Sequence, residues 1–122
     1  MEITCYYNLY VDDALVNEKE KIVAELEKGE VRSDIQIITL AQGEHNQLEF
    51  YSTNRLKQKV FSDAVLLVVG IAKEHEVAVR LVQQIVDEIY QETKNPHIRD
   101  YLLQKQREDM RKKCGERGTT DA

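Results

Sequence analysis

A nine-residue apolar run from Ala64 to Ala72 constrains the fold of this chain more than any other feature of its sequence. The run contains no charged residue, and the residues at alternate positions are apolar on both sides of an extended strand. A strand with one face in water would alternate between apolar and polar residues, so this strand is expected to be covered on both faces. We therefore expect it to lie centrally in a sheet, with Leu67 or Val69 fully buried. One predicted face carries Val65, Leu67, Val69 and Ile71, and the other carries Leu66 and Val68.

Hydrophobic periodicity predicts seven further elements around this strand. The chain begins with a strand over 3–11 and a helix that is capped by Asp12 or Asp13 and ended by Gly29. Strands over 35–41 and 48–51 follow, and then a short helix from about Ser52 to Ser62. After strand 64–72 come a helix over 74–93 and a last helix started by Asn95 and Pro96. The short helix has the weakest pattern, because its residues also suit an extended segment.

This order, β-α-β-β-(short α)-β-α-α, predicts an α/β fold: a single-domain sandwich with a mixed four-stranded sheet and helices on both faces. A ferredoxin-like two-layer α+β fold with extra C-terminal helices uses the same first six elements and is the alternative. In that alternative, strand 64–72 would lie at an edge of the sheet. The predicted domain covers residues 1–113, and the polar residues 114–122 are predicted to form a flexible tail.

Composition narrows the class of protein. A chain of 122 residues has room for one domain. It contains neither a long apolar run suited to a membrane span nor a secretion signal, so no membrane partner is expected. Cys5 and Cys114 are its only cysteines. Two isolated cysteines do not make a disulfide framework, which favours a soluble, cytoplasmic protein with reduced thiols.

The charge distribution argues against nucleic acid as the main partner. The formal net charge is −5, and only the segment after Pro96 has an excess of basic residues. Phosphate affinity needs clustered cations, whereas Glu108 and Asp109 dilute this segment. A nucleic-acid accessory role for the basic C-terminal helix is the weakest of the alternatives. Its cations are Lys105, Arg107, Arg111, Lys112, Lys113 and Arg117.

A possible ligand site follows the central strand, where open α/β sheets tend to bind small molecules and a helix N-terminus offers free N–H groups. Gly70, Lys73 and His75 are the candidate ligand-binding residues. His75 is a candidate general base, with Glu74 or Glu76 as an orienting partner. The competing explanation is structural, because acidic residues in a first helical turn complement the helix dipole. The alternative function is thus a small-molecule- or anion-binding protein or enzyme.

Sequence motifs for other chemistry are absent. Gly70 stands alone after its strand, so neither phosphate-binding glycine motif is present. His45, His75 and His97 are isolated, and no spacing suggests a metal site, a cofactor or a catalytic triad.

The preferred hypothesis is a self-associating protein-interaction domain without catalysis. Tyr6, Tyr7 and Tyr10 lie on one strand and suit either a packed sheet face or a partner surface. On the helix over 74–93, eight apolar residues form a recurring stripe that is wider than one sheet face is expected to cover: Val77, Ala78, Leu81, Val82, Ile85, Val86, Ile89 and Tyr90. We therefore predict a homodimer whose interface includes the C-terminal helices, with Ile98, Tyr101 and Leu102 as candidates.

Overall fold

The apolar run forms strand β4 (Val65–Ala72), which lies inside a four-stranded sheet in the computed structural model of the chain. The structure describes residues 2–29, 34–40, 47–57 and 65–120. Before β4 come β1 (Glu2–Val11), the 3-10 segment η1 (Asp13–Glu18), α1 (Lys19–Lys28), β2 (Gln36–Leu40), β3 (Leu48–Ser52) and the 3-10 segment η2 (Thr53–Lys57). After it come α2 (His75–Thr93) and α3 (Ile98–Thr120).

The strand order in the sheet is β1-β4-β2-β3. β1 pairs with β4 in parallel, whereas β2 pairs in antiparallel fashion with both β4 and β3. The short connection between β2 and β3 joins an antiparallel hairpin, as expected for so few residues. The central position of β4 confirms the predicted α/β class and mixed sheet, and it excludes the ferredoxin-like alternative, in which this strand lies at an edge.

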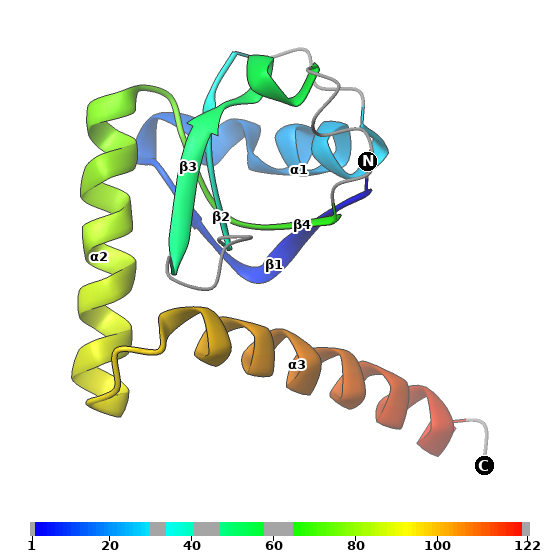
Figure 1. The fold of residues 1–122 in the computed structure, drawn as a ribbon. Coiled ribbons are helices and arrows are strands. Elements are labelled where there is room, and N and C mark those ends of the chain that lie inside the picture. Colours follow the sequence, from blue (N-terminus) through cyan, green and yellow to red (C-terminus); the bar gives the residue numbers. More distant parts are fainter. Residues whose placement is uncertain (1, 30–33, 41–46, 58–64, 121–122) are drawn as a thin grey trace.

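The sheet has a hydrophobic core on each face, so the molecule has three layers (Figure 1). On one face, α1 and η1 pack through Leu15, Ile22 and Leu26. On the other, α2 and α3 pack through a longer set of buried residues: Ala78, Leu81, Ile85, Ile89, Ile98 and Leu102. β4 contributes side chains to both cores, and for this reason neither of its faces carries a polar side chain.

The predicted assignment of β4 side chains to faces is wrong in its second half. Val69 packs with the α2 core, but Ile71 packs with Val68 in the α1 core. The pairing of β4 with β2 shifts its register near this point, so the strict alternation of side chains is interrupted. Gly70 lies at the shift, and a Cβ atom there would be 3.0 Å from Ile38 Cδ1. Val69 is fully buried, whereas Leu67 is only half-buried.

Local capping explains where the helices begin and end. Ala14 N donates a hydrogen bond to Asp12 Oδ1 (3.1 Å), so Asp12 caps η1 as expected. Gly29 ends α1 in the left-handed conformation, with φ +73°, which glycine adopts without strain. His97 N donates to Asn95 Oδ1 (2.9 Å), so Asn95 forms the turn that precedes α3.

The structure differs from the prediction in two segments of the chain. The segment expected as a short helix is the 3-10 turn η2, and its residues after Lys57 lie outside the described part of the chain. Helix α3 continues through Thr120, past the boundary placed at residue 113. The division into a domain over 1–113 and a flexible tail over 114–122 stays a prediction.

Candidate functional site

The segment after β4, predicted as a ligand site, is tied to the end of β1 by one aspartate. Lys73 N donates a hydrogen bond to Asp12 Oδ2 (3.0 Å), and Asp12 N donates to the Ile71 carbonyl (3.0 Å). The carboxylate of Asp12 therefore already accepts the hydrogen bond of Lys73 N, a backbone N–H group that an anionic ligand would otherwise bind. Because the same carboxylate also caps η1, its position follows from the fold.

The candidate catalytic residues and the ligand-binding candidate Lys73 are exposed, and their side chains do not surround a common site. Lys73, Glu74, His75 and Glu76 are all exposed, and neither glutamate hydrogen-bonds His75 in the described structure. The His75 ring instead lies 5.1 Å from the Phe50 ring of β3, centroid to centroid. None of the four main cavities lined by described residues includes any of these four residues or Gly70. A ligand site here stays a prediction without a cavity to support it.

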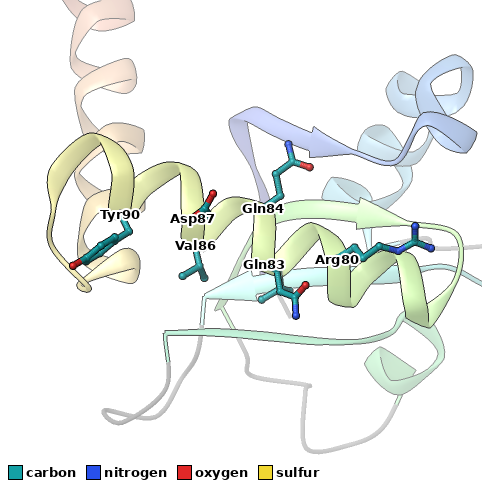
Figure 2. Close-up of a pocket in the computed structure, with 7 residues that line it drawn as sticks. Arg80, Gln83, Gln84, Val86, Asp87 and Tyr90 are labelled. Carbon is teal, nitrogen blue, oxygen red and sulfur yellow. The ribbon is translucent and has the colours of Figure 1, made fainter.

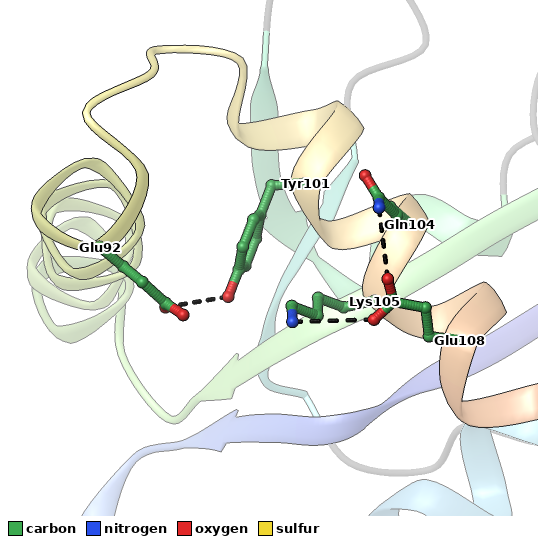
Figure 3. A network of polar contacts seen from close by, with 5 residues as sticks. All are labelled: Glu92, Tyr101, Gln104, Lys105 and Glu108. Atoms are coloured by element: carbon green, nitrogen blue, oxygen red, sulfur yellow. Dashed lines mark hydrogen bonds and ion pairs between the residues drawn. The ribbon is translucent and has the colours of Figure 1, made fainter. Parts of the chain in front are cut away.

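Two of the three candidate interface residues on α3 are buried within the chain itself. Ile98 and Leu102 are 2% and 1% exposed and pack in the α2 core. Tyr101 is half-buried, and its hydroxyl donates a hydrogen bond to Glu92 Oε2 on α2 (2.9 Å; Figure 3). The first turns of α3 thus dock on their own subunit, which leaves Tyr101 as the member of this group that reaches the surface.

Polar side chains lie beside Tyr101, which extends from α3 toward Glu92 of α2 (Figure 3). Lys105 Nζ lies 5.6 Å from the centre of the Tyr101 ring and 3.7 Å from Glu108 Oε2. Burial raises the pKa of Tyr101 to about 12, with the hydrogen bond to Glu92 and the charge of that carboxylate as further causes. A phenol with so high a pKa stays protonated at neutral pH and acts as a hydrogen-bond donor, not as a base.

The tyrosines of β1 join the same region of the molecule. Burial is the main cause that raises the pKa values of Tyr6 and Tyr10, and for Tyr10 the hydrogen bond to Glu88 on α2 raises it further. Tyr7 N donates to Gln106 Oε1 of α3 (3.0 Å). The three tyrosines therefore help to fasten α2 and α3 to β1. This arrangement supports packing and not proton transfer.

An apolar surface is left uncovered on one side of α2, which we call the α2 flank and define as Val79, Val82, Val86 and Tyr90. The spacing of these residues places them on one side of the helix, next to the buried stripe. Val86 is 38% exposed and Tyr90 45% exposed. Val82, Val86 and Tyr90 line an open hollow. The polar side chains that complete its lining are those of Arg80, Gln83, Gln84 and Asp87 (Figure 2).

The sequence indicated this surface without locating it. Eight apolar positions on α2 make a stripe wider than a single core stripe, but the predicted interface candidates are Ile98, Tyr101 and Leu102 of the next helix. The spacing of Val82, Val86 and Tyr90 by four residues was the available signal. It was not decisive, because periodicity alone does not show which side of a wide stripe the sheet covers.

The described residues offer neither a metal site nor a membrane-spanning helix. No group of three or more His, Cys, Asp or Glu side chains in the described part of the chain is arranged to hold a metal ion. His45 lies outside the described residues, and His97 is exposed. No helix among the described residues is long and apolar enough to cross a membrane.

No protein-family model, curated protein or solved structure matches this chain.

Proposed function

We propose that this protein is a self-associating protein-interaction domain without catalysis, and that it forms a homodimer through the α2 flank. The observation that carries this proposal is the exposure of Val86 and Tyr90 beside each other on a helix whose adjoining stripe is fully packed. Single exposed apolar residues are ordinary on a protein surface, but neighbouring ones that line a hollow suit a partner. Tyrosine is also enriched at such contacts.

A second copy of the chain is the occupant that the charges of α2 favour. Arg80 lies toward the N-terminal half of the exposed side of α2, whereas Asp87 lies toward its C-terminal half, and both line the hollow. Among the described residues, Arg80 has no ion-pair partner. A two-fold axis pairs two α2 helices in antiparallel directions, which brings each Arg80 toward Asp87 of the other helix.

The test is the mass of the protein in solution. Light scattering at micromolar concentration should give twice the monomer mass of 14.2 kDa. The double variant Val86→Ser with Tyr90→Ser should be monomeric while keeping its circular dichroism spectrum. Val16→Ser is the matched control, since Val16 is 55% exposed on η1, which belongs to the other helical layer. A wild-type protein of monomer mass would refute the proposal.

The other two functional classes have less support. The residues after β4 line no main cavity, and Arg107 and Arg111 are exposed cations beside the acidic Glu108 and Asp109. A thermal-shift screen against small anions and a binding assay with nucleic acid would each detect these activities directly.

We also propose a cytoplasmic location for this domain. Cys5 is a free, half-buried cysteine, and burial together with the charge of Glu27 raises the pKa of its thiol to about 12. A thiol that stays protonated is a poor nucleophile, so this residue acts as a small core residue. Free thiols of this kind suit a reducing compartment.

A further inference from the structure

The two edges of the sheet differ in their capacity to pair with another strand. At one edge, β1 is irregular: its pairing with β4 shifts register between Cys5 and Tyr10, and Tyr7 N already donates to Gln106 of α3. At the other edge, β3 pairs with β2 through all five of its residues without a register shift. Irregularities and covering elements protect edge strands, whereas a regular edge offers a row of backbone groups. Among the described strands, β3 therefore has the edge better suited to pairing.

The edge of β3 adjoins the α2 flank. Leu48 and Phe50 of β3 are half-buried and pack beside the α2 core. The Phe50 ring lies 5.1 Å from that of His75, which shares a side of α2 with Val79 and Val86. Figure 1 shows β3 at the margin of the sheet nearest to α2. The apolar flank and the regular strand edge thus belong to one continuous side of the molecule.

We propose that β3 pairs with β3 of a second copy in antiparallel fashion, about a two-fold axis at Phe50, so that the two four-stranded sheets form one continuous sheet. The inference rests on the proposed self-association and specifies its geometry. The two half-buried Phe50 rings lie opposite each other in this register, on the side of the sheet that α2 covers. Cross-strand aromatic pairs stabilise antiparallel strands.

Charge complementarity on the opposite face favours a second copy as the occupant. Glu49 and Tyr51 are on the face of β3 opposite Phe50, which is the face that α1 covers. The Arg55 guanidinium lies 5.8 Å from the centre of the Tyr51 ring. With the axis at Phe50, Glu49 lies opposite the partner's Tyr51 and approaches the partner's Arg55. The symmetry repeats this carboxylate–guanidinium pair, so a single surface supplies both halves of two ion pairs.

Hydrogen exchange of the wild-type protein is the first test. Exchange of amides in 48–52 should slow as the protein concentration rises through the dimerisation range, whereas exchange in β1 should stay unchanged. If the chain dimerises and the exchange of β3 does not depend on concentration, this geometry is wrong while the proposed self-association stands. If the chain stays monomeric at every concentration, both proposals fail.

Charge reversal is the second test. Glu49→Arg and Arg55→Glu should each raise the dimer dissociation constant by roughly tenfold, since each change places like charges together at two symmetric positions. The double variant should restore the wild-type dissociation constant. Glu20→Arg, at an exposed position of α1, is the matched control and should leave it unchanged. Equal dissociation constants for all four variants would overturn the proposed register.

Discussion

At the scale of single residues, neighbouring positions of β4 differ sharply in what they contribute. Leu66 is 2% exposed and packs in the α1 core. Leu67 is half-buried and lines a groove beneath α3 together with Leu103 and Met110. The energetic value of a leucine in this strand thus depends on which helical layer covers it and how closely.

Leu66→Ala and Leu67→Ala form a matched pair that measures this difference. Leu66→Ala should lower the free energy of unfolding by about 2–5 kcal/mol, because it removes fully buried methyl groups and leaves a cavity. Leu67→Ala should cost roughly half as much, since water already reaches one side of that residue. Urea titration measures both values. Equal losses for the two variants would show that α3 covers Leu67 as tightly as α1 covers Leu66.

At the scale of elements, α3 is attached through its first turns and through specific polar contacts. Ile98 and Leu102 supply the buried contacts, Tyr101 donates to Glu92, and Gln106 accepts from the backbone of β1. Met110, one turn further on, is 57% exposed. From Ile98 to Met110, the side chains of α3 therefore become less buried against the rest of the subunit.

The hydrogen bond of Tyr101 predicts a pH dependence of stability. The pKa of Tyr101 is raised in the folded protein from 10.0 to about 12, because burial and Glu92 favour the protonated phenol. The stabilisation is therefore fully present below pH 10 and is lost as the pH rises toward 12. Tyr101→Phe should cost about 0.5–1.5 kcal/mol at neutral pH. In urea titrations, this difference from wild type should disappear between pH 10 and pH 12. A difference that is constant over this range would show that the phenol contributes through packing alone.

Truncation tests the graded docking of α3 directly. A chain that ends at Arg111 should keep its melting temperature within about 2 °C, because the described contacts of α3 with the sheet and α2 involve residues before that point. A chain that ends at Pro96 should lose about 3–6 kcal/mol, since it lacks the buried Ile98 and Leu102. A large loss from the shorter deletion would place a stabilising contact beyond Arg111, within the subunit or across the dimer.

Elements with strong periodicity were predictable from the sequence, and the details that depend on pairing were not. The apolar run predicted the central strand because both faces of β4 are covered, and the wide stripe predicted α2. The face of Ile71 was mispredicted, since the register shift beside Gly70 arises from pairing with β2 and leaves no periodic signal. For the same reason, the sequence did not predict which edge of the sheet is regular.

The candidate site shows the same limit at the scale of the whole molecule. The residues around His75 were chosen from their position after a central strand, but whether a cavity forms there depends on how β1 and β3 approach. In this fold, Asp12 from the end of β1 binds Lys73 N, and Phe50 of β3 lies against His75. The apolar character of Ile98 and Leu102 predicts an interface, but composition does not distinguish a helix that docks on its own subunit from one that docks on a partner.

The shared central strand predicts that the whole molecule unfolds as one cooperative unit. Ile22 packs in the α1 core and Ile85 in the α2 core, yet β4 contributes side chains to both. Ile22→Ala and Ile85→Ala should therefore each shift a single urea transition, with an unchanged slope and coincident midpoints by circular dichroism and tyrosine fluorescence. Tyr6 and Tyr101 make the fluorescence sensitive to the α2 layer. If Ile22→Ala moved the circular dichroism transition and left the fluorescence transition in place, the two layers would unfold independently. β4 would then not couple them, despite its place in both cores.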